Sequence, residues 1–218
     1  MKMLLRFIPS RGGTILDVAC GMGTTTRFLT NTFLAGNVTG INISRHQLAD
    51  CRKLAPRCRF LQMNATALGS GPNYFDNIIC VEAALHFVTS EKFLSEAHKV
   101  LKPGGLLVLS DIVPARSRKV PNRFAPTEQV ISPAEYRDLY FRGGFERVEI
   151  IDASRECSTG FRRHSLRLLQ SNFRDGKMDR ATFHAARERI IRRERDKGYY
   201  LLVCAQKTAR NDIFFDLS

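Results

Sequence analysis

A short apolar stretch followed by glycines holds the residues of this chain best suited to bind a small ligand. Residues 15–18 are typical of a strand, Gly21 and Gly23 of a tight turn, and a helix is expected from Thr24. Glycines remove side chains where the backbone turns and where a ligand must approach it, and the acidic Asp17 lies just ahead of them. The pattern predicts a cofactor site, with glycines used only for packing as the alternative.

The spacing of these glycines indicates which kind of cofactor is bound. A dinucleotide fingerprint G-x-G-x-x-G would place glycines at positions 19, 21 and 24, where this chain has Ala19, Gly21 and Thr24. The missing third glycine argues against close packing of a pyrophosphate on the start of the helix. An adenosyl ligand without phosphate fits this loop better, and S-adenosylmethionine is such a ligand.

Further motifs follow in an order that resembles the class I S-adenosylmethionine-dependent methyltransferases. They are G-I-N-I-S at 40–44, N-A at 64–65, F-D at 75–76 and V-L-K-P-G-G at 100–105. With residues 82–87, they look like the branch that methylates small molecules, which includes natural-product, tocopherol and glycine-betaine enzymes. The resemblance covers residues 14–150 well and the rest loosely. It implies S-adenosylmethionine as cofactor and S-adenosylhomocysteine as product.

The resemblance also implies which residues contact the cofactor. They lie in the glycine loop and after the following expected strands: Asp17, Ala19, Gly21, Gly23, Asn42, Ile43, Asn64, Ala65, Val81 and Glu82. Ala19 stands where the family has its first glycine, and Asn42 and Asn64 stand where the family has acids that hold the ribose and meet the adenine. Either the cofactor is bound less tightly than usual, or Asp17 carries most of the anchoring. A purely local role in a turn is the alternative for Asn42.

Strands and helices are expected to alternate along the chain, which indicates an α/β fold. The resemblance implies a Rossmann-like doubly wound sheet of seven strands, mostly parallel with an antiparallel last strand, and a helical insertion before that strand. We expect a single methyltransferase domain over residues 1–218, with its core at about 14–151 and 199–207 and a helical lid insertion at about 155–197. The N-terminal lid of the resembling enzymes is expected to be absent, because the first strand begins near residue 14.

The residues after the fourth expected strand, at 77–81, are the candidates for chemistry. Ligands of open α/β sheets bind beyond the carboxyl ends of the strands, which places Glu82, His86 and Phe87 beside the donor methyl. His86 is the first candidate for a catalytic base, because histidine titrates near neutral pH, and a structural hydrogen-bonding role is its alternative. Glu82 acts either as a base or by orienting the cofactor or acceptor. His86 and Phe87 are also expected to contact the acceptor.

The chain is strongly basic, with a formal net charge of +13 at pH 7. Thirteen Lys and Arg stand against six Asp and Glu between residues 155 and 197. Such an excess suits nucleic acid, an anionic membrane surface or an acidic substrate, and a solvated helical face is the alternative. We expect that one of Arg162 and Arg163, with Arg123 of the preceding linker, binds a carboxylate or phosphate on the acceptor.

Composition and cysteine spacing restrict the other classes of protein. No apolar run approaches the roughly 20 residues of a membrane span, and we expect a cytoplasmic protein. The six cysteines show no C-x-x-C spacing, so they read as reduced packing residues, and no metal site is expected. The sequence leaves open whether the chain forms a homodimer.

The expected reaction moves the methyl group of S-adenosylmethionine to an O, N or C atom of a small-molecule acceptor in secondary metabolism. Three alternatives remain, and one of them, an arsenic methyltransferase, needs several mobile thiolates, more than these cysteines are expected to expose. A non-catalytic cofactor-binding or scaffold protein would explain the amides Asn42 and Asn64, and an RNA methyltransferase would explain the charge. Nucleic acid is not the expected partner, because Val81-Glu82-Ala83-Ala84 lacks the Asn or Asp followed by Pro-Pro and an aromatic of nucleic-acid amino methyltransferases. The identity of the acceptor lies beyond the sequence.

Overall fold

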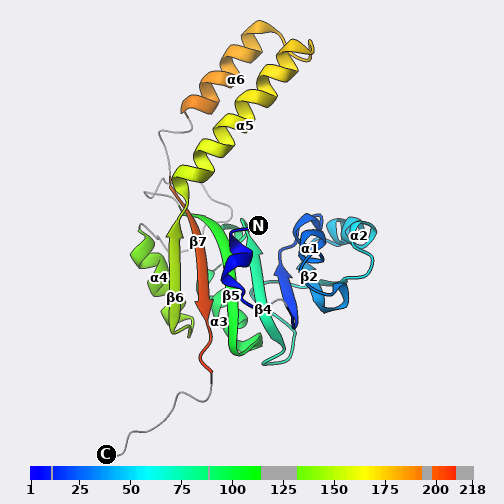
Figure 1. Ribbon diagram of the computed structural model, residues 1–218, viewed down its shortest axis with the longest axis vertical. Coiled ribbons are helices and arrows are strands. Elements are labelled where there is room, and N and C mark those ends of the chain that lie inside the picture. The colour runs from blue at the N-terminus through cyan, green and yellow to red at the C-terminus, as the bar shows by residue number, and fades with distance from the viewer. Residues whose placement is uncertain (11, 88, 114–131, 193–197, 210–218) are drawn as a thin grey trace, which may run out of the picture.

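The computed structural model describes residues 1–10, 12–87, 89–113, 132–192 and 198–209 (Figure 1). Seven strands form one sheet in the order β3-β2-β1-β4-β5-β7-β6. β7 runs antiparallel to both of its neighbours, and the other described pairs are parallel. The predicted α/β sheet with an antiparallel last strand is therefore confirmed. The strands are β1 (Ile15–Val18), β2 (Val38–Asn42), β3 (Arg59–Gln62), β4 (Phe75–Val81), β5 (Leu101–Val113), β6 (Arg147–Asp152) and β7 (Tyr199–Gln206).

Helices and short 3-10 turns, labelled η, connect these strands. The sequence S-P-A-E at 132–135 is typical of a capping box, and the Ser132 hydroxyl accepts a hydrogen bond from the Glu135 backbone N–H at 3.2 Å. The helix expected from Thr24 ends at Leu29, where the Thr30 hydroxyl bonds back to the Arg27 carbonyl at 2.8 Å. The helical elements are η1 (Leu4–Phe7), α1 (Thr24–Leu29), η2 (Ala35–Asn37), α2 (Arg45–Leu54), η3 (Ala84–His86), α3 (Ser90–Val100), α4 (Pro133–Arg142), α5 (Ser154–Arg174) and α6 (Arg180–Arg192).

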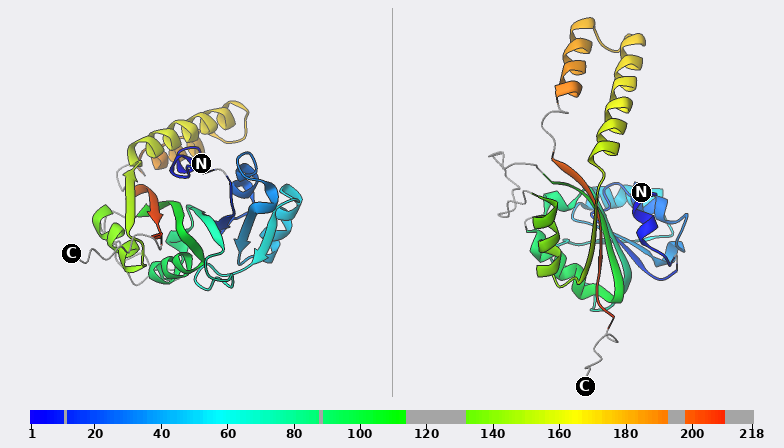
Figure 2. Two further views of the ribbon diagram at one scale, coloured as in Figure 1. Left: turned by 60° about the horizontal axis from the view of Figure 1, so that its bottom comes forward. Right: turned by 60° about the vertical axis from the view of Figure 1, so that its left-hand side comes forward.

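Both faces of the sheet are covered, which explains why its central strands are apolar throughout. Leu16 and Val18 of β1 pack in a core with α3 and α4, whereas Ile15 packs in a second core with η1 and α1. This alternation follows from the two-residue repeat of a strand. The right-hand view of Figure 2 shows the sheet nearly edge-on, with α4 on one side and the N-terminal turn on the other.

The strand β5 is longer than the sequence predicts. Lys102-Pro103-Gly104-Gly105 is a sequence typical of a helix end, and the prolines after Asp111 are typical of an irregular linker, but β5 spans residues 102–105 and Asp111. Leu101 pairs with Phe75, and the second half of the strand pairs with the whole of β7. Asp111 is consequently a buried strand residue, 4% exposed. The rest of the expected linker, including Arg123, lies outside the described residues.

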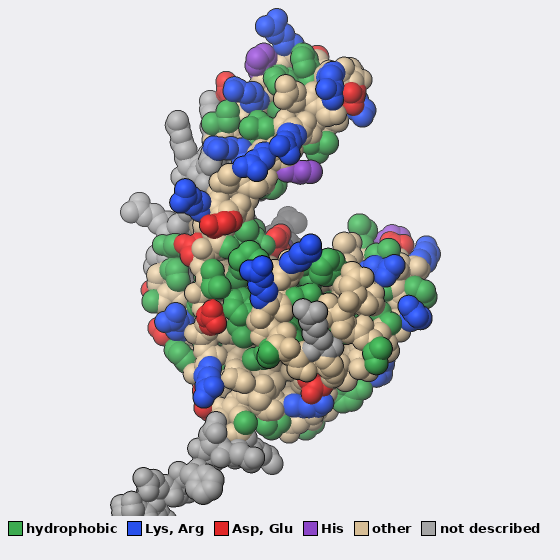
Figure 3. Space-filling view, viewed as in Figure 1, with side chains coloured by type: hydrophobic (Ala, Val, Ile, Leu, Met, Phe, Trp, Pro, Cys, Tyr) green, Lys and Arg blue, Asp and Glu red, His purple; other side chains and the backbone are tan. Residues whose placement is uncertain are grey.

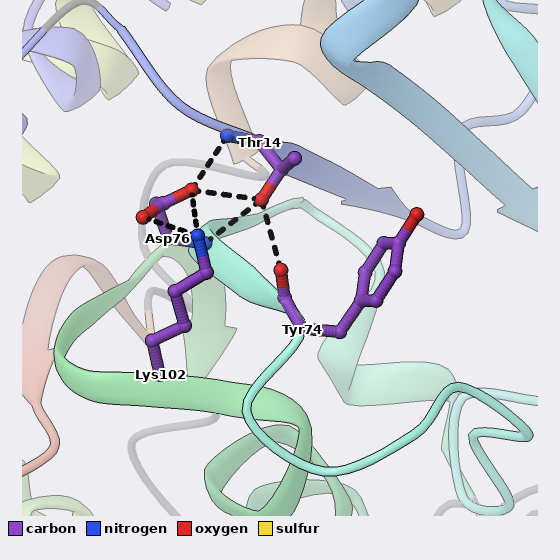
Figure 4. Close-up of polar contacts among 4 residues, drawn as sticks. All are labelled: Thr14, Tyr74, Asp76 and Lys102. Carbon is purple, nitrogen blue, oxygen red and sulfur yellow. Dashed lines mark hydrogen bonds and ion pairs between the residues drawn. The ribbon is translucent and has the colours of Figure 1, made fainter.

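A polar cluster joins the starts of the three central strands at the amino edge of the sheet (Figure 4). The Asp76 carboxylate accepts hydrogen bonds from the Thr14 backbone N–H at 2.7 Å and the Thr14 hydroxyl at 2.9 Å. It also lies 2.8 Å from the Lys102 ammonium, and the Thr14 hydroxyl donates to the Tyr74 carbonyl at 3.1 Å. The cluster fixes β1, β4 and β5 relative to one another, and the opposite ends of β1 and β4 carry the candidate site.

Replacing Asp76 tests how much this cluster stabilises the sheet. Burial alone would raise the pKa of Asp76, but Lys102 and Thr14 outweigh it and hold that pKa below its ordinary value. The stabilisation is therefore present above the ordinary pKa of an aspartate and is lost as the pH falls toward the lower folded value. Because the carboxylate is partly exposed, we expect Asp76→Asn to lower the free energy of unfolding by only about 1 kcal/mol at pH 7.

Urea unfolding at pH 7 and at pH 3 measures both effects. The difference between Asp76→Asn and the wild-type chain should shrink at the lower pH. Asp50→Asn is the control, since Asp50 makes an exposed ion pair with Lys53 at 3.6 Å. Equal losses of unfolding free energy in Asp76→Asn and Asp50→Asn would contradict the stabilising role of the cluster.

A helical hairpin of α5 and α6 rises from the carboxyl edge of the sheet between β6 and β7 (Figures 1 and 2). The two helices pack together through Phe173 and Phe183, whose ring centroids lie 4.7 Å apart. At the root, the Tyr200 backbone N–H donates to the Ser154 hydroxyl at 2.8 Å. The predicted helical insertion is confirmed, and within the described ranges no helix has the length and apolarity needed to cross a membrane.

Candidate functional site

The candidate site lies at the centre of the sheet, where the strand order reverses. β1 lies between β2 and β4, with Val18 level with Ile41 on one side and with Cys80 on the other. All three strands are parallel, so their carboxyl ends open at one edge. Ligands of open α/β sheets bind at such a reversal. The segments that leave β1 and β4 are therefore the two walls of the candidate site.

Both walls begin with a residue in a strained backbone conformation. Ala19 has a φ of 55° and Glu82 a φ of 51°. This left-handed region costs a residue with a side chain about 1–2 kcal/mol, and such strain gathers at functional sites. The other described non-glycine residue with positive φ is Asn73, a type that tolerates it. The φ of Ala19 is suited to glycine, which is the residue that the resembling family has at this position.

The two loop glycines have different surroundings. A Cβ added at Gly21 would meet no heavy atom within 4 Å, whereas one added at Gly23 would lie 3.1 Å from the Cys51 side chain and backbone. Both glycines have positive φ, 54° and 88°. Gly23 is therefore required where the loop packs on α2, whereas the backbone at Gly21 faces open space.

Asp17 lies beneath the loop and is 1% exposed. Its carboxylate accepts a hydrogen bond from the Thr26 hydroxyl at 2.6 Å, which ties the end of β1 to the first turn of α1. Burial raises the pKa of Asp17 to about 7, although the Thr26 bond opposes this shift. Asp17 therefore changes its charge close to neutral pH.

Asn42 holds the glycine loop in place from the end of β2. Its amide nitrogen donates to the Gly21 carbonyl at 3.2 Å and to the Gln47 side chain at 2.8 Å, and its amide oxygen accepts from the Ser44 backbone N–H at 3.0 Å. A carboxylate could not make the first two bonds, because it has no hydrogen to donate. The local role considered for Asn42 is thus observed, and it extends to the loop.

The remaining expected cofactor residues lie along the same edge. Ile43 follows Asn42 and is 69% exposed. Asn64 is exposed after β3, and its amide oxygen accepts from the Thr66 backbone N–H at 3.0 Å, while Ala65 is buried. Val81, at the end of β4, is partly buried against the η1 face of the sheet. Ile43 and Asn64 thus present exposed side chains on the β2 and β3 side of the glycine loop.

Glu82 makes a contact that the sequence did not indicate. The Tyr200 hydroxyl donates to the Glu82 carboxylate at 2.6 Å, which joins the carboxyl end of β4 to the amino end of β7. Burial, followed by this bond, raises the pKa of Tyr200 well above the ordinary value of a tyrosine. Tyr200 is also bonded through its backbone to the root of the hairpin. The side chain of Glu82 therefore has a fixed direction.

His86 and Phe87 follow Glu82 and point to different environments. His86 is exposed at the end of η3, and the Leu85 backbone N–H beside it donates to Asp111 at 3.2 Å. Burial raises the pKa of Asp111, whose other oxygen accepts from the Tyr136 hydroxyl at 2.7 Å. Phe87 packs edge-on against Phe93, with ring centroids 4.8 Å apart, so it contacts the core as well as the site edge.

A family model described as a methyltransferase domain matches residues 15–105, from β1 into β5. These residues include both walls of the site and Asn42. These residues therefore form a methyltransferase domain. The methyltransferase family predicted from the glycine loop and the later motifs is confirmed for this part of the chain.

Two curated methyltransferases illustrate the similarity. A 2-methyl-6-phytyl-1,4-hydroquinone methyltransferase of Synechocystis is 38% identical over 116 residues, which is 52% of this chain and 36% of that protein. An O-methyltransferase of Penicillium expansum is 30% identical over 159 residues, which is 68% of this chain and 57% of that protein. The chain thus spans less than two thirds of the length of these relatives.

Solved structures show the same methyltransferase fold. One is a phosphoethanolamine N-methyltransferase of Haemonchus contortus in complex with phosphomonomethylethanolamine and S-adenosylhomocysteine. Its TM-score is 0.72 at 17% identity, and the superposition covers 96% of this chain and 52% of that protein. Another is the [4+2]-cyclase SpnF, with a TM-score of 0.70 at 25% identity, and this superposition covers 95% of this chain and 80% of that protein. The fold alone therefore does not fix the reaction.

The sequence did not indicate that Tyr200 and Asp111 lie at this candidate site. Tyr200 lies near the start of β7, and only the antiparallel direction of this strand brings its start to the carboxyl edge beside Glu82. Prolines at 114, 121 and 126 follow Asp111 in the sequence, a pattern typical of a linker. Within the described part of the chain, no group of three or more His, Cys, Asp or Glu is placed to hold a metal ion.

Proposed function

We propose that this chain binds S-adenosylmethionine in the loop from Ala19 to Gly23 and transfers its methyl group to a small-molecule acceptor. The observation that best supports this is the open space at Gly21, opposite the strained Glu82, at the strand reversal of a class I methyltransferase. When bound, S-adenosylmethionine supplies a sulfonium methyl group that an O, N or C nucleophile takes by in-line displacement, leaving S-adenosylhomocysteine.

The chain's own residues then hold and orient the reactants. The Ala19–Gly23 backbone forms the floor of the site, and Asn42 fixes it through the Gly21 carbonyl. We assign the exposed Ile43, with Asn64 and Ala65, to the adenosyl end, and Val81 and Glu82 to the end near the methyl group. Alignment of two reactants at near-attack distance lowers a barrier by about 7–11 kcal/mol, so positioning supplies most of the acceleration.

We assign His86 the role of accepting the proton that a hydroxyl acceptor loses. It is exposed at the carboxyl edge, and the bond from Leu85 to Asp111 anchors its turn to β5. His86→Ala should lower kcat for a hydroxyl acceptor by about 100-fold and leave the Kd of the cofactor within about twofold, since general-base catalysis contributes roughly that much. Steady-state kinetics with calorimetry measure both quantities. An unchanged kcat in a folded variant removes His86 from the mechanism.

We infer that Tyr200 positions Glu82 and does not itself react. Tyr200→Phe should weaken cofactor binding about threefold to tenfold, because a charge-assisted hydrogen bond contributes about 1.5–3 kcal/mol in a protected site and less at an exposed one. In a Glu82→Gln background the same change should have little further effect. Tyr199→Phe, the neighbouring residue on the same strand, is the matched control. Additive losses in the double variant would show that Tyr200 acts by another route.

The basic hairpin bears on the expected anionic acceptor. Arg162 and Arg163 are both exposed on α5, and adjacent helical residues point about 100° apart. Arg163 shares a face with Arg167 and Arg174, so we propose Arg162 for a carboxylate or phosphate of the acceptor. Arg123, the other residue assigned to this role, lies outside the described residues and remains a sequence-based proposal.

Incubation with S-adenosylmethionine and a panel of phenols, amines and carboxylic acids, read by S-adenosylhomocysteine formation, tests the proposed reaction. Turnover of a small acceptor supports it. Tight cofactor binding without turnover on any acceptor would favour the non-catalytic alternative, and turnover on RNA would favour the RNA methyltransferase. We further propose a role in secondary metabolism, because an erythromycin 3''-O-methyltransferase is among the relatives.

We propose a cytoplasmic location, since the described cysteines are all free thiols. A homodimer is retained as a proposal about the oligomeric state, and size-exclusion chromatography with light scattering decides it.

A further inference from the structure

The hairpin carries much of the basic excess, and the proposed reaction uses little of it. Residues 154–192 contain ten Lys and Arg against four Asp and Glu. The hairpin contacts the sheet at its root, through β7, and projects beyond the carboxyl edge (Figure 2). Figure 3 shows basic side chains gathered along the hairpin, with hydrophobic side chains between them.

The basic side chains of each helix form a row. On α5, Arg163, Arg167 and Arg174 are spaced four and seven residues apart, which places them on one helical face. On α6, Arg180 and Arg187 are seven residues apart, with Ile191 four residues further on the same face.

The packing of the hairpin brings both rows to one side. The helices meet through Leu169 and Phe173 of α5 and through Phe183 of α6. At 100° per residue, the α5 row is rotated by roughly 120° from its packing line and the α6 row by roughly 50° from Phe183, in the same sense along each helix. Because the helices are antiparallel, rotations in the same sense point to the same side. The five arginines of the two rows therefore form one surface, which we call the arginine side.

The arginine side is exposed and keeps its charge. No ion pair in the described ranges joins any of its five arginines to a carboxylate, and all five are exposed. At the turn between the helices, Asp175 is instead bound by Lys177 at 3.3 Å. Glu156 is the acid that shares the α5 row, seven residues before Arg163 and next to the root.

We propose that the arginine side docks on an anionic lipid surface. α5 alone is about 30 Å long, so the five guanidinium groups are spread over a long, straight surface that matches a plane of phosphate headgroups. Ile191, 37% exposed, accompanies the arginines of the α6 row, as apolar side chains do in helices that lie in a membrane interface. Phe173 lies on the packing line, with its ring centroid 4.7 Å from that of Phe183, so it is not open to stack on the bases of a nucleic acid.

Vesicle sedimentation of the full chain without cofactor tests the proposal. The wild-type chain should bind vesicles of phosphatidylcholine with about 30% phosphatidylglycerol, and binding should be lost with phosphatidylcholine alone or at about 0.5 M salt. Replacing Arg163, Arg167 and Arg187 together by Gln should weaken binding at least 30-fold, since each basic residue near such a surface contributes about fivefold.

A matched variant separates this surface from the overall charge. Arg57, Arg137 and Arg147 are exposed on the body, and their replacement by Gln removes the same charge. The affinity of this control for anionic vesicles should fall less than threefold. Circular dichroism should show that both variants are folded. Equal losses in the two variants, no binding of the wild-type chain to anionic vesicles, or tighter binding to a single-stranded RNA that displaces the vesicles would overturn the proposal. None of these outcomes depends on methyl transfer.

Discussion

Gly21→Val should weaken the binding of S-adenosylmethionine by at least 100-fold. The space above Gly21 is open, and the loop offers its backbone to a ligand only because no side chain stands there. A branched side chain fills that space on the ligand side of the loop, and its steric cost falls on the complex. Titration calorimetry and the thermal shift caused by the ligand measure the loss.

Gly104→Val is the matched control for this prediction. Gly104 also has a positive φ, 79°, and also has no heavy atom within 4 Å of an added Cβ, but it lies at the amino edge of the sheet. Both variants therefore carry a similar backbone strain, and only Gly21→Val should lose the cofactor. Similar affinities in Gly21→Val and Gly104→Val would show that the loop is not the cofactor site.

The affinity for S-adenosylmethionine should rise about tenfold between pH 6 and pH 8, and Asp17→Asn should remove this rise. Burial raises the pKa of Asp17 to about 7, so its carboxylate ionises across this interval. The ionised form attracts the sulfonium charge through a protein interior that screens weakly. S-adenosylhomocysteine lacks the sulfonium charge and should show a smaller dependence. Calorimetry at several pH values measures each curve.

The same ionisation affects folding with a definite sign. Because the folded pKa of Asp17 lies above the ordinary 3.8, the protonated form is favoured in the folded chain, and stability falls as the pH rises from about 4 to about 7. Asp17→Asn should remove the pH dependence of stability over this interval. Asp76→Asn should leave the pH dependence of cofactor binding unchanged. A pH dependence of affinity that survives Asp17→Asn would assign it to another group.

Local patterns predicted most of the fold because they act over short distances. Apolar runs are typical of the central strands, and Ser132-Pro133 and Gly143-Gly144 are typical of the two ends of a helix, which α4 has at these residues. The length of β5 was missed, because it depends on pairing with β7, about a hundred residues later in the chain. A lysine, a proline and two glycines in sequence are typical of a helix end, and here they occupy the start of a paired strand instead.

The site was predicted in position more fully than in its contacts. Asp17, Gly21 and Glu82 were placed by the strand endings that carry them. The partners of these residues were not predicted. Thr26 bonds to Asp17, the Cys51 thiol bonds to the Gly21 carbonyl at 3.2 Å and Tyr200 bonds to Glu82, all through packing that sequence spacing does not encode. Asn42 shows the difference most clearly, because its amide contacts the glycine loop and a neighbouring helix at the same time.

Titration of the wild-type chain with S-adenosylmethionine at pH 8 tests the central claim most directly. We expect one ligand per chain with a Kd below about 100 μM, which corresponds to more than roughly 5 kcal/mol of binding free energy. S-adenosylhomocysteine should compete for the same site. A folded chain that shows neither heat nor a thermal shift with about 1 mM of either ligand would contradict the proposed cofactor site.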